Sequence, residues 1–332
     1  MVGRWLLRAV DRHHERLRDR YGIDLRLVAL ATRRGGFLHN ADGIEISRAL
    51  APRDPAAITT AVPGDRWPTA LAGLQATETD ILVEVSQSPA PEGEPGLSHL
   101  RHALRKGISV ATSNKWPVAL AGVELAALAE RRAIGFRAES TVMSGTPVLA
   151  ALTTGLRGAE PIRLRGIVNA TVNLICSRMA AGGSYADALA EAQEGGLAER
   201  DPGADLDGFD SVAKLMVLSA LVFGVQLEID DVSRRGLSAV GDAELEAALA
   251  GGEVVRELIE LEPRAGLAAV RAGAVTPEDP LFGIDGTTNA IHLDVEPVGR
   301  IVISGPGAGR PLAGQGVFSD LIALARERAG RT

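Results

Sequence analysis

Two lysines are the strongest candidates for chemistry in this sequence. Only three of the 35 basic residues are lysines, at positions 106, 115 and 214, and the others are arginines. Codon bias can explain the ratio, but arginine cannot replace lysine where a proton must leave, because guanidinium stays protonated. Lys106 ends a predicted helix just before a glycine, which indicates a structural role. Lys115 and Lys214 remain as candidates for acid–base chemistry.

An acidic segment, residues 199–210, precedes Lys214. Asp210 and Lys214 are four residues apart, so on a helix they share a face and can pair. Such a pair is usually a surface salt bridge. The apolar run 215–223 that follows is instead typical of a buried helix. The two interpretations stay open, and in the second a partly desolvated ammonium held by a carboxylate can serve as a general acid.

Two further groups follow predicted strands. Lys115 comes after strand 108–111, and in open α/β sheets ligands bind at the carboxyl ends of the strands. A solvated loop lysine is an equally good interpretation. Arg33 and Arg34 follow predicted strand 25–31. Arginine at that position favours the 2'-phosphate of NADP over NAD, and solvated loop arginines are the alternative.

The elements that would position these residues alternate in the first half of the chain. The pattern predicts helices at 5–20 and 97–106 and strands at 25–31, 81–85 and 108–111, which is typical of an α/β fold with a Rossmann-type doubly wound nucleotide-binding domain. The first strand and the first two glycines of the Gly-x-Gly-x-x-Gly fingerprint are missing from the sequence. Gly3 is either the third glycine of that fingerprint or part of an ordinary helix. We therefore expect the natural start to lie upstream of Met1.

The second half has a different pattern, which predicts a mixed α+β domain. We expect helices at 149–155 and 170–181, a loop at 195–208, a long helix through Lys214, and a last helix at 316–328. The predicted strands of this half lie near residues 258–262, 267–272, 290–295 and 299–304. The predicted domains are 1–137, completed by 305–332, and 138–304.

Composition excludes several classes of protein. The net charge of -7 and the pI near 5.5 argue against a nucleic-acid surface, which needs basic residues to neutralise phosphates. No apolar run approaches the ~20 residues of a membrane-spanning helix. The single cysteine, Cys176, excludes an internal disulfide and cannot form a metal site alone. We expect a cytoplasmic protein.

In this order, the motifs resemble the homoserine dehydrogenase family over essentially the whole chain. The matching stretches are residues 80–85, 111–115, 139–147, 166–173, 199–214 and 305–309. The resemblance implies reduction of L-aspartate 4-semialdehyde to L-homoserine with NADPH or NADH, on the route to threonine and methionine. It also implies a homodimer formed through the second domain.

The resemblance assigns roles to individual residues. Lys214 looks like the proton donor to the aldehyde oxygen, with Asp210 beside it, and Lys115 would lie between cofactor and substrate. Glu199 and Gly196 would bind the substrate, Glu199 through the substrate ammonium. Cofactor contacts are implied for Ser86 and Gly307, and Gly3 joins them if it is the third glycine of the fingerprint. A monovalent cation such as sodium is implied for Glu139, Val142, Ser144 and Thr146, mostly through backbone carbonyls, since hard cations take oxygen ligands.

The sequence departs from the family at three places. The missing strand and glycines reduce the pyrophosphate site. Ala170, Val172 and Leu174 stand where the family commonly has Gly, Thr and Tyr, which leaves a related substrate open. The regulatory domain of some members is not expected. Two alternatives therefore stay: a Rossmann oxidoreductase with another substrate, and a non-catalytic homologue with an impaired cofactor site.

Overall fold

The computed structural model describes residues 2–330, and Met1, Arg331 and Thr332 lie outside the described residues. The chain forms two compact units. The first comprises Met1–Pro117, Glu124–Ala138 and Ala313–Thr332, and the second Val118–Val123 and Glu139–Leu312. Within residues 2–330, none of the helices combines the length and apolar composition that a membrane span requires.

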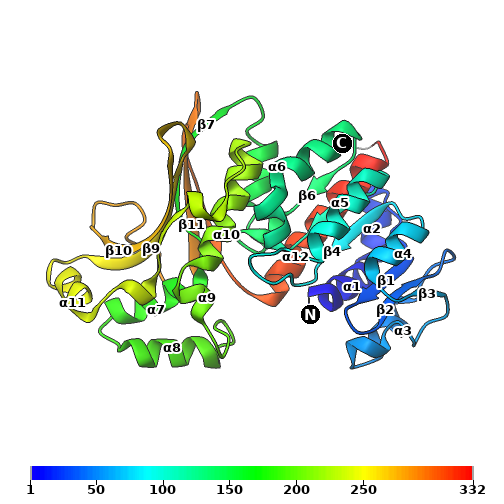
Figure 1. Ribbon diagram of the computed structural model, residues 1–332, viewed down its shortest axis with the longest axis horizontal. Coiled ribbons are helices and arrows are strands. Elements are labelled where there is room, and N and C mark those ends of the chain that lie inside the picture. Colours follow the sequence, from blue (N-terminus) through cyan, green and yellow to red (C-terminus); the bar gives the residue numbers. More distant parts are fainter. Residues whose placement is uncertain (1, 331–332) are drawn as a thin grey trace. The chain divides into compact units, whose positions relative to one another are not determined.

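The first unit holds two small sheets and the helices beside them (Figure 1). Most residues of α6 and α12 belong to it. Its helices and strands are α1 (Val2–Arg12), α2 (His14–Tyr21), β1 (Ala29–Thr32), β2 (Gly36–His39), α3 (Ile46–Leu50), β3 (Asp65–Trp67), α4 (Ala70–Ala76), β4 (Ile81–Glu84), α5 (Gly96–Lys106), β5 (Ser109–Thr112), α6 (Lys115–Arg131), β6 (Phe136–Arg137) and α12 (Arg310–Arg328).

One of these sheets is parallel, with strand order β4-β5-β6. Ile81 lies opposite Ser109, and Val110 lies opposite Phe136. All four residues of β5 are buried, as expected for a strand covered on both faces. The predicted strands 81–85 and 108–111 and helix 97–106 are confirmed to within one residue, and with them the Rossmann-type α/β character of this half.

The prediction for residues 25–31 was wrong in extent and in pairing. The strand begins at Ala29 and pairs antiparallel with β2, in a separate sheet that β3 completes. The cause is a tight turn that ends in Gly36, whose φ of +71° is a conformation that glycine adopts readily. A buried apolar run alone does not distinguish a parallel strand from one arm of a hairpin.

The predicted helix 5–20 is two helices, because the backbone breaks at His13 between α1 and α2. Gly3 lies in the first turn of α1. A Cβ atom built on it would lie 3.4 Å from Val85 Cγ2, an ordinary contact distance, so α1 begins beside the end of β4 and a small side chain would also fit there. Leu6, Ala9 and Val10 of α1 form a core with Val317, Phe318 and Leu321 of α12.

The second unit is built on a six-stranded sheet of order β12-β11-β7-β9-β10-β8, antiparallel except for β8 against β10. Its elements are β7 (Glu160–Ile167), α7 (Ala170–Ala180), α8 (Tyr185–Glu194), α9 (Gly203–Leu206), α10 (Phe209–Leu218), β8 (Ser233–Arg235), α11 (Asp242–Ala250), β9 (Val254–Glu262), β10 (Leu267–Val275), β11 (Thr288–Glu296) and β12 (Gly299–Pro306).

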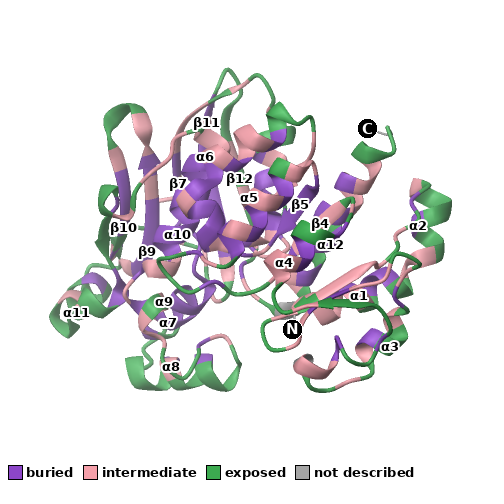
Figure 2. Cartoon of the chain, turned by 45° about the vertical axis from the view of Figure 1, so that its right-hand side comes forward, coloured by how far each residue is buried: buried purple, intermediate pink, exposed green. Residues whose placement is uncertain are grey.

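Helices α7, α10 and α11 pack on strand β9, whereas α8 is mostly exposed (Figure 2). The predicted α+β character of this half and its four strands are confirmed. The predicted helix 149–155 is confirmed, with π-helical geometry at residues 150–154. Two details were wrong: the loop 195–208 contains the short helix α9, and strand β7 was not predicted. Alternating arginines and apolar residues in β7 were the missed signal, because only one face of this strand is apolar.

Candidate active site

Helix α10 carries Lys214 and buries it. The helix begins after Gly208, which has a φ of +80°, and all residues from Ser211 to Leu218 are buried. Asp210 lies in its first turn, where a negative charge interacts favourably with the helix dipole. The apolar residues on every side of α10 therefore place one lysine in a largely dry environment. Of the two interpretations of the Asp210/Lys214 spacing, the buried one is confirmed.

The ammonium of Lys214 has two close partners. Its Nζ atom lies 2.7 Å from Asp210 Oδ2 and donates a hydrogen bond of 2.6 Å to the carbonyl oxygen of Val168. The side chains of Lys214 and Asp210 are 11% and 16% exposed. An ammonium has three N–H donors, so these two contacts fix its position and leave one donor for a further acceptor.

Asn169 links this pair to a second carboxylate. Its Oδ1 accepts from the backbone N–H of Val172 and so caps α7, while its Nδ2 donates to Asp205 Oδ1 at 3.0 Å and to Asp210 Oδ2 at 3.5 Å. The end of β7 thus supplies both the Val168 carbonyl and the Asn169 amide. Sequence reasoning gave no role to Asn169 or Asp205. The Asn at a helix start and the acidic segment were the available signals.

The two predicted substrate residues lie in the loop after α8. Glu199 is exposed, and its backbone carbonyl accepts a hydrogen bond from Gln193. Gly196 has a φ of +68°, a conformation that larger residues rarely adopt, and a Cβ atom there would meet open space. The backbone turn, rather than close packing, therefore explains the glycine.

In the first unit, hydrogen bonds tie the carboxyl ends of β4 and β5 together. Thr112 Oγ1 donates to the Glu84 carbonyl at 2.8 Å, and the Asn114 Nδ2 group donates to Ser88 Oγ at 2.7 Å. Ser86 lies just past β4, and Lys115, half-buried, begins α6 just past β5. Two predicted cofactor residues thus lie at the strand ends where such folds bind ligands.

A buried Glu84–His99 pair supports this edge. Glu84 Oε2 lies 2.6 Å from His99 Nδ1, and Oε1 accepts a hydrogen bond of 2.8 Å from the backbone N–H of Ser86. Burial alone would raise the pKa of the Glu84 carboxyl, but these hydrogen bonds and the charge of His99 hold the pKa below its ordinary value. Glu84 therefore orients the Ser86 amide as a carboxylate.

The predicted 2'-phosphate residues lie in the turn between β1 and β2. Arg33 and Arg34 are both exposed, and Arg34 forms an ion pair of 3.3 Å with Asp54. They belong to a hairpin turn, and not to the end of a parallel strand as the sequence suggested. Their positive charge is accessible to an anion from solvent.

The predicted cation segment contacts the glycine-rich loop after β12. Ser144, with a φ of +53°, donates from Oγ to the Gly307 carbonyl, and Thr146 Oγ1 donates to the Pro306 carbonyl, both at 3.1 Å. The Glu139 carboxylate accepts from the backbone N–H groups of Leu149 and Ala150. Its side chain therefore holds a helix start.

Val142 is fully buried in the same segment. A Cβ atom on Gly307 would lie 2.1 Å from the Asn289 side chain, so no larger residue fits there.

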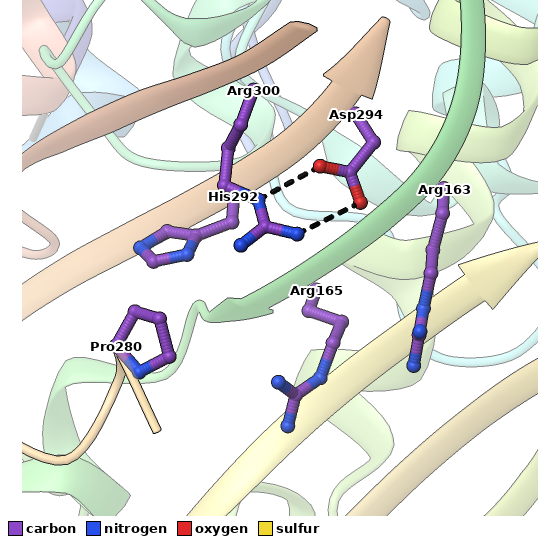
Figure 3. Close-up of a pocket in the computed structure, with 6 residues that line it drawn as sticks. All are labelled: Arg163, Arg165, Pro280, His292, Asp294 and Arg300. Atoms are coloured by element: carbon purple, nitrogen blue, oxygen red, sulfur yellow. Dashed lines mark hydrogen bonds and ion pairs between the residues drawn. The ribbon is translucent and has the colours of Figure 1, made fainter. Parts of the chain in front are cut away.

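A pocket of about 70 Å³ lies elsewhere in the second unit, lined by Arg163, Arg165, Pro280, His292, Asp294 and Arg300 (Figure 3). Arg165 pairs with Glu260 of β9. Successive side chains of a strand point to opposite faces, so Glu260 lies on the opposite face of β9 from Glu257, which contacts α10. The pocket therefore belongs to the face away from Lys214.

Comparisons with known proteins agree with this arrangement. The family model for homoserine dehydrogenase matches residues 147–322. The homoserine dehydrogenase of Sulfurisphaera tokodaii is 34% identical over 86% of this chain and 88% of its own length. The NAD(+)-dependent homoserine dehydrogenase of Pseudomonas canavaninivorans is 31% identical over 97% of this chain and 92% of its own length.

Solved structures give the same result. A putative homoserine dehydrogenase from Archaeoglobus fulgidus has a TM-score of 0.83 at 28% identity and covers 97% of this chain and 95% of its own. A hyperthermophilic archaeal homoserine dehydrogenase in complex with NADPH has a TM-score of 0.81 at 28% identity, covering 97% and 93%. The chain therefore belongs to the homoserine dehydrogenase family, whose members are NAD(P)-dependent oxidoreductases.

Proposed function

We propose that this chain reduces L-aspartate 4-semialdehyde to L-homoserine with a reduced nicotinamide cofactor. The observation that carries the proposal is the buried Lys214–Asp210 pair, held by the Val168 carbonyl and by Asn169. A homologue that had lost its activity would have no need to keep a desolvated lysine so closely oriented. The family membership and this site together disfavour the non-catalytic alternative.

Lys214 is the proton donor in this proposal. The cofactor, when bound, supplies a hydride to the aldehyde carbon, and the developing alkoxide needs a proton. Two N–H groups of the ammonium are directed at Asp210 and Val168, and the third donates to the substrate oxygen. Asp210 holds the ammonium and balances its charge. Glu199 and Gly196 bind the substrate, with the Glu199 carboxylate taking the substrate ammonium.

On the cofactor side, we assign contacts to Ser86, Lys115, Gly3 and Gly307. The residues present fit a dinucleotide, because Ser86 and Lys115 lie just past the carboxyl ends of the parallel strands β4 and β5, where such folds bind ligands. Residues 1–137 with 305–332 are the proposed NAD(P)-binding domain, and residues 138–304 bind the substrate and form the dimer. Two compact units with boundaries near these positions support the division.

Three finer properties are also proposed. A homodimer forms through the second unit, supported by the sheet face with Arg163, Glu260 and Arg300, which no helix of the described chain is seen to cover. A monovalent cation binds the oxygen-rich segment with Glu139, Val142, Ser144 and Thr146, where backbone carbonyls are suitable ligands. The reaction takes place in the cytoplasm, where an amino-acid biosynthetic enzyme meets its substrates.

The central test compares two lysine-to-arginine variants in a spectrophotometric assay of NADPH oxidation with aspartate semialdehyde. Lys214→Arg keeps the positive charge but cannot release a proton, so we expect a loss of kcat of about 100-fold to 10,000-fold. Lys106→Arg is the matched control, because Lys106 donates to the backbone carbonyls of Leu74 and Thr77 and pairs with Glu78, outside the proposed site. Circular dichroism checks folding. Unchanged turnover of Lys214→Arg would refute the proposed role.

The cofactor preference has its own test. Replacing Arg33 and Arg34 together by glutamine should raise KM for NADPH and leave KM for NADH unchanged, because only NADPH carries the 2'-phosphate. The paired control is Arg53→Gln, an exposed arginine outside the β1–β2 turn. An equal rise in KM for both cofactors would count against the assignment of NADP.

A further inference from the structure

A second buried carboxyl group contacts the helix that carries the Lys214–Asp210 pair. Glu257 of β9 is 4% exposed and points at α10, where the Ser211 hydroxyl donates to its Oε1 at 2.6 Å. Its Oε2 atom has no hydrogen-bond partner among residues 2–330. A Cβ atom on Gly208 would lie 3.3 Å from this oxygen, so Glu257 faces the start of the helix that carries Lys214.

The surroundings of Glu257 keep it protonated at neutral pH. Burial raises the pKa of its carboxyl to about 8, with smaller contributions from the negative charges of Asp210 and Asp205; the Ser211 hydrogen bond and the charge of Lys214 act in the opposite direction. Its neighbour in β10 is Ala272, which carries no charge.

Neither of the two remaining ionisable neighbours, Cys176 and Arg256, forms an ion pair with the Glu257 carboxyl. Cys176 of α7 is a neutral thiol, because burial raises its pKa to about 12. Arg256, the preceding residue of the strand, is turned to the 282–285 loop, where it donates to the Phe282 carbonyl and lies 3.9 Å from the Asp285 carboxylate.

We propose that Glu257 is a positioning residue that sets the charge around Lys214: protonated, it leaves the lysine facing the Asp210 carboxylate, and ionised, it adds a negative charge that makes the ammonium a weaker acid. The inference rests on the proposed role of Lys214. Loss of the Glu257 proton would make Lys214 hold its own proton more tightly. The reduction would then slow as the pH rises through the ionisation of Glu257.

The kinetic test follows kcat/KM for reduction of aspartate semialdehyde from pH 6 to pH 10. Glu257→Gln keeps the shape and the hydrogen bond to Ser211 but cannot ionise. We expect it to match the parent protein at pH 6.5 and to exceed it by about threefold to tenfold at pH 9, the effect of one extra nearby charge on a general acid. Glu246→Gln, at an exposed position of α11 outside both the site and the proposed dimer face, should follow the parent throughout. Superimposable profiles for Glu257→Gln and the parent would overturn the proposal.

A second measurement does not depend on turnover. Infrared difference spectra over the same pH range should show a protonated carboxyl band that disappears near pH 8 and is absent in Glu257→Gln. Coupling between two ionisable groups is reciprocal, so Lys214→Met should move this titration to higher pH. An unmoved titration would overturn the coupling even if the enzyme is active. If Lys214→Met moves the titration but the parent protein does not reduce the semialdehyde, the proposed function is refuted and the coupling between Glu257 and Lys214 is retained.

Discussion

Glu257 should make the stability of this protein fall as the pH rises. Its pKa is raised from an ordinary 4.5 to about 8 in the folded chain. The folded state therefore holds a proton that the unfolded chain releases between these two pH values. A carboxyl group of this kind gives its full stabilisation below pH 4.5 and has lost it above pH 8.

The size of the effect follows from the width of that window. One pH unit of differential protonation corresponds to about 1.4 kcal/mol, so roughly 3 kcal/mol is lost between pH 4.5 and pH 7. For 150 to 250 residues, 1 kcal/mol shifts Tm by roughly 2 to 4 °C. The Tm of the parent protein should therefore fall by about 3 to 5 °C per pH unit relative to that of Glu257→Gln.

Scanning calorimetry of the parent protein and of Glu257→Gln from pH 5 to pH 8 measures this difference in Tm. The other titrating groups are the same in both proteins, so their contributions to the pH dependence cancel in the difference. All three tryptophans, Trp5, Trp67 and Trp116, lie in the first unit, so tryptophan fluorescence separates its unfolding from that of the second unit. Glu246→Gln, an exposed residue of α11, is the control, and its Tm should differ from that of the parent by the same amount at every pH. A Tm difference between Glu257→Gln and the parent that stays constant across this range would refute the protonated, buried carboxyl.

Three further outcomes are expected. Cys176, which is 2% exposed and whose pKa burial raises to about 12, should not react with maleimide in the folded protein at pH 8, and rapid labelling would contradict its burial. Glu84→Gln should destabilise the first unit by about 1 to 3 kcal/mol above pH 4.5. Because the folded pKa of Glu84 is lowered, this difference should shrink as the pH falls below 4.5, and a pH-independent difference would be inconsistent. Asn169→Ala should lower kcat of the reduction about tenfold or more through loss of the Asp210 contact, whereas Asn40→Ala, far along the chain in an exposed turn, should not.

The sequence could predict the parts of the site that are local. Asp210 and Lys214 lie one helical turn apart, and the apolar run behind them predicted their burial, because both properties follow from the period of a helix. The strands of the parallel sheet were equally predictable from short apolar runs between turn residues. The hairpin at Ala29–Thr32 was not, since the pairing direction of a strand depends on its neighbours rather than on its own residues.

The partners of the lysine are instead distant in sequence. Val168 and Asn169 precede it by more than 40 residues and Glu257 follows it by 43, and β7 and β9 bring all of them to α10 through the pairing of the sheet. Glu257 stands next to Arg256 in a strand whose charged and apolar residues do not alternate strictly, so the sequence pattern does not indicate which charged residue points inward. Only the hydrogen bond from Ser211 and the strand alternation identify it as facing α10, while Glu260 faces the other side.

The net charge of this site depends on whether Glu257 is protonated, and the amino-acid sequence alone does not indicate that. If Asp205, Asp210 and Glu257 were all ionised, three negative charges would lie in the poorly solvated region that holds one ammonium, and each would add to the cost of burying charge. Removing water from Glu257 lets the fold keep the carboxyl shape, and its hydrogen bond to Ser211, without the charge. The same burial that makes stability fall at alkaline pH also keeps Glu257 uncharged near Lys214 at neutral pH. Because Glu257→Gln keeps the shape of the side chain but cannot ionise, it should remove both pH effects and leave the packing unchanged.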